Sequence, residues 1–127
     1  MSFKTHLKIL VMCITLSVLM KISSVSGLDC PGGFDPGSPA SCIQDVQGYS
    51  RYDCPYETCG HAGHKWVWMS NCVPYPDGSG FSNQKCEKYN YLRPGLYTCE
   101  NHGGYTYQCF HKLGDRPVIS CENCTKR

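Results

Sequence analysis

Residues 54–72 carry the clearest structural pattern of the chain, and they read Cys54-Pro-Tyr-Glu-Thr-Cys59-Gly-His61-Ala-Gly-His64-Lys-Trp66-Val-Trp68-Met-Ser-Asn-Cys72. Between the cysteines, residues 65–70 alternate aromatic side chains with others at the period of a β-strand. Glycine or proline recurs every few residues along the rest of the chain, without helical apolar periodicity. The stretch therefore predicts short strands that are held together by cysteine chemistry.

The pattern of alternation recurs farther along the chain. A second strand is expected at residues 105–110, and weaker strand candidates lie at 89–97 and 117–120. Glycine and proline predict loops at 74–82 and a turn at 93–95. The expected fold is a small β-rich, partly irregular domain with little helix, stapled by disulfides, by zinc or by both.

The first 27 residues have the organisation of a signal peptide. Lys4 and Lys8 precede an apolar run at residues 9–20, and small residues follow Lys21. The run is shorter than the roughly 20 apolar residues that span a membrane. We expect cleavage after Ser26 or Gly27, secretion, and no membrane contact by the mature chain, residues 28–127.

Removal of residues 1–27 changes the charge balance. Three lysines leave with the signal peptide, so that nine basic residues face ten acidic ones and the formal charge changes from +2 to −1. A mature chain without excess positive charge lacks the basic face that phosphate binding requires. We therefore expect no nucleic-acid partner.

Ten cysteines remain in residues 28–127. An even number in a small secreted chain is typical of a disulfide framework, although ten cysteines allow about 945 pairings. Only ten Ile, Leu and Val residues accompany them, so the apolar core is small and cross-links or metal are needed. The cysteines expected in disulfides are Cys30, Cys42, Cys54, Cys59, Cys72, Cys86, Cys99, Cys109, Cys121 and Cys124.

Zinc is the alternative to disulfides for some of these cysteines. Two pairs of ligands, each with two residues between its members, are separated by 18 residues, which is the spacing of a tetrahedral zinc site. That candidate site consists of Cys99, His102, Cys121 and Cys124, and a weaker candidate consists of Cys54, Cys59, His64 and Cys72. Ordinary polar histidines in loops, beside cysteines that are all paired, remain the other interpretation.

A faint internal repeat divides the mature chain. Similar series of cysteines, histidines and aromatic residues run through residues 28–88 and residues 89–127. The alternative explanation is that the similarity arises by chance in a cysteine-rich composition. We therefore expect residues 28–127 to form one cysteine-rich domain. Its two halves are either related by the repeat or unrelated.

Catalysis is not expected. The sequence contains no Gly-x-Ser-x-Gly, no His-Glu-x-x-His and no glycine-rich phosphate loop that would fix a nucleophile or a base. If every mature cysteine has a partner, none is free to act as a catalytic thiol. We therefore expect a binding protein and not an enzyme.

The Tyr-x-Cys pattern occurs at residues 52–54, 97–99 and 107–109. With the signal peptide and the ten cysteines, the chain resembles the small cysteine-rich secreted effectors of rust fungi and similar plant pathogens. The resemblance implies an avirulence-type virulence protein, secreted or translocated into the host cell, where a host protein or an immune receptor binds it. Some members, including one from flax rust, are zinc-binding folds, which implies ligands here for three zinc ions.

The expected function is binding by a rigid surface. Candidate contacts are the loop at residues 74–82 and the aromatic residues Trp66 and Trp68, for which packing in the core is the alternative. Two other functions remain open. One is a disulfide-rich extracellular inhibitor or toxin-like module, and the other is a carbohydrate-binding module that stacks sugars on exposed aromatic rings.

Overall fold

Short antiparallel strands make up most of the described chain. The computed structural model describes residues 24–110 and 118–127, and the helical element in these ranges is a single 3-10 turn, η1, at Tyr56–Thr58. The strands are β1 (Leu28–Asp29), β2 (Gly33–Asp35), β3 (Ala40–Ile43), β4 (Arg51–Cys54), β5 (Val67–Pro74), β6 (Ser82–Arg93), β7 (Leu96–Asn101), β8 (Thr106–Phe110), β9 (Ser120–Cys121) and β10 (Thr125–Lys126). The expected β-rich fold with little helix is confirmed. Most of the predicted signal peptide, residues 1–23, lies outside the described residues.

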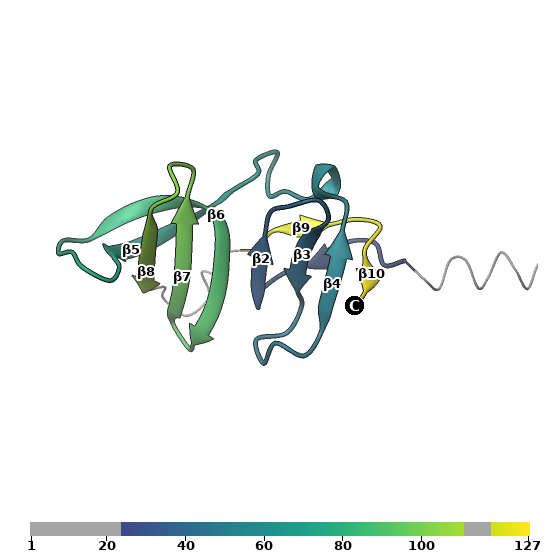
Figure 1. Cartoon of the computed structure of the whole chain (residues 1–127), viewed down its shortest axis with the longest axis horizontal. Helices are drawn as coiled ribbons and strands as arrows, with labels where there is room; N and C mark the ends of the chain where they lie inside the picture. Colours follow the sequence, from purple (N-terminus) through teal and green to yellow (C-terminus); the bar gives the residue numbers. More distant parts are fainter. Residues whose placement is uncertain (1–23, 111–117) are drawn as a thin grey trace, which may run out of the picture.

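Four consecutive strands close into a ring. β6 pairs with β5 and β7, and β8 pairs with the same two strands, all antiparallel. Figure 1 shows these four strands grouped at the left of the molecule. We term residues 67–110 the barrel lobe, because their strands pair around a closed ring as in a β-barrel. Such closure leaves few strand edges free.

Alternation along β5 decides which side chains enter the barrel lobe. Val67 and Met69 are buried, whereas Trp68 between them is exposed. The register to β6 then shifts between Met69 and Cys72, and Asn71 adopts a φ of 53°. This bulge reverses the alternation, so that Cys72 is buried like Met69.

The second lobe is built from both ends of the described chain. β3 pairs with β2 and β4, β10 pairs with β4, and β1 pairs with β9. We term residues 24–66 and 118–127 the terminal lobe, which lies at the right of Figure 1. An isolated bridge also joins Val25 to Cys124, and cleavage after Ser26 or Gly27 would remove it.

One long strand belongs to both lobes. Asn90 of β6 lies opposite Gly33 of β2 on one side and opposite Thr98 of β7 on the other. A Cβ atom on Gly33 would lie 2.6 Å from Asn90 Oδ1 and 3.2 Å from the carbonyl oxygen of Tyr89, so this approach of strands requires glycine. The predicted boundary between the halves, after residue 88, falls inside β6, and the repeat itself stays a prediction.

Tyr89 fastens the two lobes to each other. Its side chain is fully buried, and its hydroxyl donates to the carbonyl oxygen of Cys30 (2.7 Å) and accepts from the amide of Ile119 (2.9 Å). Burial raises the pKa of the Tyr89 hydroxyl, since the charged phenolate would be desolvated there. A strand of the barrel lobe thus supplies hydrogen bonds to two separate segments of the terminal lobe.

All ten cysteines of residues 28–127 are paired, so the expected disulfide framework is confirmed. The terminal lobe contains three disulfides and the barrel lobe contains two. They are Cys30–Cys42, Cys54–Cys124 and Cys59–Cys121 in the terminal lobe, and Cys72–Cys109 and Cys86–Cys99 in the barrel lobe.

Candidate functional site

The four residues of the better predicted zinc site are not brought together. Cys99 is bonded to Cys86 in the barrel lobe, whereas Cys121 and Cys124 form disulfides within the terminal lobe. His102 is exposed after the end of β7, and its Nδ1 lies 2.6 Å from Glu87 Oε1. The spacing predicts two adjacent pairs of metal ligands, but Cys99 is buried in the barrel lobe whereas His102 is exposed beyond the end of β7. These four residues therefore do not fit one zinc ion.

The weaker predicted set is also divided. Cys54 and Cys59 do lie close together, and Cys121 joins them. Cys72 is bonded to Cys109 in the barrel lobe, and His64 is exposed. The structure thus keeps two members of this set and places the other two elsewhere.

A tight turn presents the two histidines of the stretch 54–72. His61 and His64 exchange both backbone hydrogen bonds, at 2.8 and 2.9 Å, across Ala62 (φ 49°) and Gly63 (φ 80°). Positive φ at both central residues is the geometry of a two-residue hairpin turn. Gly60, before the turn, exchanges a pair of backbone hydrogen bonds with Ser120, which anchors it to the terminal lobe.

Lys65 fixes the turn from its other side. Its Nζ donates to the carbonyl oxygens of Tyr56 (3.0 Å), Glu57 (3.1 Å) and Cys59 (2.5 Å). The same ammonium lies 4.8 Å from the centroid of the Tyr56 ring. The lysine therefore satisfies the carbonyl groups around η1 and holds this segment against the start of β5. This role of Lys65 could not be predicted from the sequence, because it depends on three carbonyl groups that only the fold brings together.

Aromatic rings follow the turn and form one exposed surface. The His64 ring stacks on Trp66 (centroids 4.4 Å apart, planes at 26°), and Trp66 meets Trp68 edge to face (5.3 Å, 81°). Lys85, opposite Trp68 on β6, places its Nζ 4.8 Å from the Trp66 ring and 5.3 Å from the Trp68 ring. We term His64, Trp66, Trp68 and Lys85 the aromatic surface. Trp68 is 55% exposed, so its predicted contact role is compatible with the structure and full packing in the core is not.

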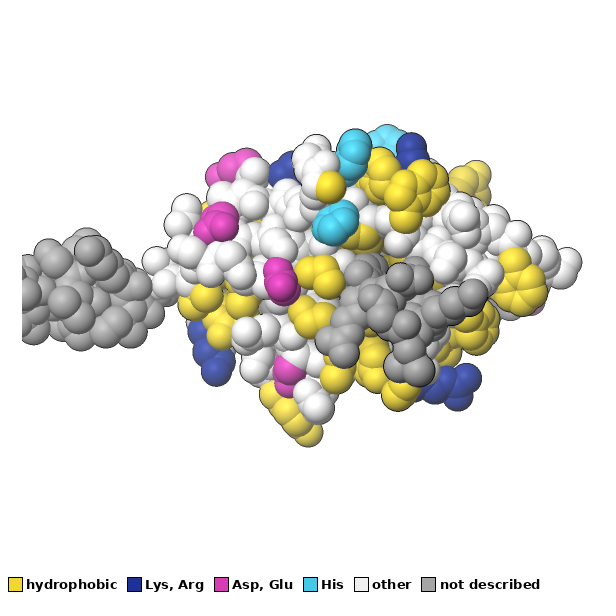
Figure 2. All heavy atoms as spheres, turned by 180° about the vertical axis from the view of Figure 1, so that it is seen from behind, with side chains coloured by type: hydrophobic (Ala, Val, Ile, Leu, Met, Phe, Trp, Pro, Cys, Tyr) yellow, Lys and Arg dark blue, Asp and Glu magenta, His cyan; other side chains and the backbone are white. Residues whose placement is uncertain are grey.

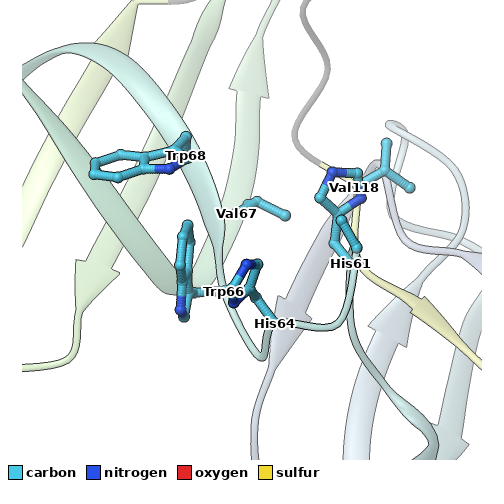
Figure 3. A pocket seen from close by; sticks show the side chains of 7 residues that line it. His61, His64, Trp66, Val67, Trp68 and Val118 are labelled. Carbon is cyan, nitrogen blue, oxygen red and sulfur yellow. The ribbon is translucent and has the colours of Figure 1, made fainter.

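A hollow of about 280 Å³ lies beside the aromatic surface. Figure 3 shows the rings of His64 and Trp66 next to each other, with His61 on the opposite side near Val118. The lining residues are His61, Ala62, His64, Trp66, Val67, Trp68 and Val118. In the space-filling view from behind, histidine side chains gather with hydrophobic ones at the top of the molecule (Figure 2). The arrangement offers open ring faces and imidazole nitrogens to a partner.

The loop predicted as a second contact is exposed at the end of the β5–β6 hairpin. Tyr75 is 53% exposed and Phe81 is 72% exposed. The amide of Tyr75 donates to the carbonyl oxygen of Thr106 at 3.0 Å, which ties the start of the loop to β8. The loop therefore presents aromatic side chains, although neither of them belongs to the aromatic surface.

Comparisons with protein-family models, with curated proteins and with solved structures found no match. Along residues 24–110 and 118–127, no helix has the length and apolar character needed to cross a membrane.

Proposed function

We propose that this protein is a secreted binding protein that contacts a host protein through the aromatic surface. The observation that carries the proposal is the exposure of Trp68 beside Trp66 and His64 on a closed, disulfide-linked ring of strands. Tryptophan is over-represented among the residues that contribute most to protein–protein affinity. Large aromatic groups that stay in water are therefore best explained by a partner that covers them.

Rigidity favours the same function. Trp66 and Trp68 are on or next to β5, which is paired on both sides, and Cys72–Cys109 links β5 to β8. A surface that is already ordered loses little conformational entropy when a partner binds. The aromatic surface can therefore bind without prior folding of its scaffold.

The effector role extends the proposal to the biological setting. The resemblance to avirulence-type effectors of rust fungi, the apolar N-terminal run and the disulfides together favour secretion toward a plant host, with entry into the host cell and recognition by an immune receptor as further steps. Zinc belongs to this proposal only for a reduced protein, because all ten cysteine sulfurs of the mature chain are used in disulfides.

Carbohydrate binding is the second candidate function. The observation that favours it is an exposed indole of Trp68 at the rim of an open hollow, which the side chain of His61 lines from the opposite side. Sugar rings stack on such indole faces while their hydroxyl groups bond to polar neighbours. The protein would then be retained on chitin or another insoluble glycan, and the W68A variant would not. This result would support carbohydrate binding over contact with a host protein.

A site-specific cross-linking experiment tests the proposed function. A photo-reactive amino acid replaces Trp68 in one variant and Tyr49 in a control, since Tyr49 is 85% exposed but does not belong to the aromatic surface. We expect one host protein to be cross-linked from position 68 and not from position 49. The purified partner should then bind W68A at least tenfold more weakly than the unsubstituted protein, and equal affinities would refute the proposal.

The cellular location of action is tested separately. The chain is expressed in host leaves with and without residues 1–27, and cell death or altered immune signalling is recorded. An effect of the form without the signal peptide supports an effector that acts inside cells. An effect that requires secretion supports the extracellular inhibitor instead.

A further inference from the structure

Eight of the ten paired cysteines gather in two groups of four. In one group, the Sγ atoms of Cys54, Cys59 and Cys121 lie within 4.8 Å of one another, and in the other group the same holds for Cys86, Cys99 and Cys109. The fourth sulfur of each group is bonded directly to one of these three. We term them cluster A, which consists of Cys54, Cys59, Cys121 and Cys124, and cluster B, which consists of Cys72, Cys86, Cys99 and Cys109.

We propose that each cluster, once its two disulfides are reduced, binds one zinc ion through four thiolates. A tetrahedral site with zinc–sulfur bonds of about 2.3 Å has sulfur atoms about 3.8 Å apart. Three of the four sulfurs in each cluster already lie within 4.8 Å of one another, and the fourth is bonded to one of these three. Reduction therefore only has to let each bonded pair separate, while the strands that carry the cysteines stay close to their present places.

Burial supplies the energetic reason. Every sulfur-bearing side chain in the two clusters is at most 3% exposed. Reduction alone would leave four thiols in a space that was shaped for two disulfides, without any cross-link. Zinc restores the cross-link, because one ion joins four chain positions, and a structural zinc ion contributes folding free energy directly.

Cluster A has a positive group close by. The ammonium of Lys65 lies 2.5 Å from the carbonyl oxygen of Cys59, a member of the cluster. A zinc ion with four thiolates carries two negative charges, which this ammonium would partly balance. The charge of the lysine thus favours the zinc-bound form of cluster A.

The chemistry requires a dithiol reductant, and its balance is simple. Two dithiol molecules each transfer two electrons, which converts two protein disulfides into four protein thiols and two oxidised dithiols. One zinc ion then replaces four thiol protons, which are released to solvent. Thiol–disulfide exchange of this kind occurs in reducing compartments, where thiols are maintained.

These sites differ from the zinc site expected from the sequence. That site included His102, which lies beside Glu87 at the surface. Clusters A and B contain sulfur only, and they leave Cys30 and Cys42 outside. The proposal therefore specifies two zinc ions per chain, and it does not depend on the aromatic surface.

Zinc content measures the proposal directly. The full-length purified protein is reduced with dithiothreitol under nitrogen, freed of reductant, mixed with zinc chloride and separated from unbound metal by gel filtration. We expect two zinc ions per reduced chain and less than a tenth of one per oxidised chain. Absence of zinc from the reduced protein, or equal binding by both forms, would overturn the proposal.

Variants distinguish the two clusters from adventitious binding. Replacement of all four cysteines of either cluster by alanine should leave one zinc ion per chain, whereas C30A/C42A, the matched control, should keep two. H102A and W68A should also keep two, so that failure of the partner-binding proposal has no effect here. Two ions in either cluster variant, none in either of them, or a loss in C30A/C42A would contradict two independent sites.

Cobalt reports the ligand type in the same samples. Reduced protein loaded with Co²⁺ should show the charge-transfer and visible absorption of tetrahedral tetrathiolate sites, with half of the intensity in each cluster variant. A spectrum typical of three sulfur ligands and one nitrogen would contradict sulfur-only coordination.

Discussion

The barrel lobe and the terminal lobe achieve stability in different ways. The barrel lobe is contiguous in sequence, and its strands of five to twelve residues hydrogen-bond around a closed ring. The terminal lobe has strands of two to four residues, and its disulfides Cys54–Cys124 and Cys59–Cys121 span 70 and 62 residues of chain. Local strand pairing therefore supports the barrel lobe, whereas long-range covalent links support the terminal lobe.

The largest expected effect comes from removal of the two long-range disulfides together. The variant C54A/C59A/C121A/C124A should lose about 4 kcal/mol of unfolding free energy, because a loop of 62 residues or more is no longer closed. Denaturant unfolding measures the loss. Removal of Cys54–Cys124 alone should cost less, since Cys59–Cys121 would still close nearly the same loop.

The matched variant C72A/C86A/C99A/C109A, which lacks both disulfides of the barrel lobe, should lose less unfolding free energy than the terminal-lobe variant. These disulfides span 37 and 13 residues, and the closed ring of strands remains. A loss equal to or greater than that of the terminal-lobe variant would break the distinction between the lobes.

The joint between the lobes has the next largest effect. Y89F removes the hydroxyl that bonds to Cys30 and Ile119, which leaves a buried carbonyl and a buried amide without this partner. A buried donor or acceptor that loses its hydrogen-bond partner lowers the free energy of unfolding by about 1–3 kcal/mol. We expect a loss of about 2 kcal/mol, with faster amide hydrogen exchange at Ile119 than in the unsubstituted protein. Unchanged exchange there would show that Tyr89 does not hold the terminal lobe.

Alkaline pH should weaken the same joint. Burial raises the pKa of Tyr89 in the folded state, so that above about pH 10 the unfolded chain releases this proton while the folded chain keeps it. The contribution of the Tyr89 hydroxyl to the free energy of unfolding is therefore fully present below about pH 10. Above that pH, the free energy of unfolding falls by up to about 1.4 kcal/mol per pH unit. Urea unfolding at a series of pH values checks this slope. Y89F should lack this part of the slope, and an identical slope in both proteins would contradict it.

The smallest effect on stability is expected at the aromatic surface. Trp68 is 55% exposed, and W68A should change the unfolding free energy by less than about 1 kcal/mol while partner binding is lost. Thermal melting of both proteins measures the difference. A loss above about 2 kcal/mol would mean that Trp68 packs the barrel lobe and is not primarily a contact residue.

Local features were predictable from the sequence, and long-range ones were not. The alternation at residues 65–70 and 105–110 identified parts of β5 and β8, and residues 93–95 do form the turn between β6 and β7, where Gly95 has a φ of 79°. The even number of cysteines predicted disulfides, which the structure confirms. Their pairing depends on β6, whose length and membership in both lobes leave no mark on local composition.

The strand residues of the candidate site could be predicted from the sequence, but their neighbours on other strands could not. Trp66 and Trp68 were identified as strand residues, but only the register to β6 reveals that Lys85 lies over both rings. The spacing of Cys99, His102, Cys121 and Cys124 resembled a zinc site because sequence distance says nothing of strand direction. Cys99 faces the interior of the barrel lobe, and its partner Cys86 comes from the neighbouring strand.

The long-range pairing of Cys54 and Cys59 sets an order on biosynthesis. During synthesis from the N-terminus, these two thiols emerge before their partners and have to wait until Cys124 and Cys121, 70 and 62 residues later, have also emerged. Meanwhile residues 67–110 contain every partner that the barrel lobe needs. The lobe whose first strands are translated earliest is thus completed last, and until then the thiols of Cys54 and Cys59 are open to exchange with other cysteines.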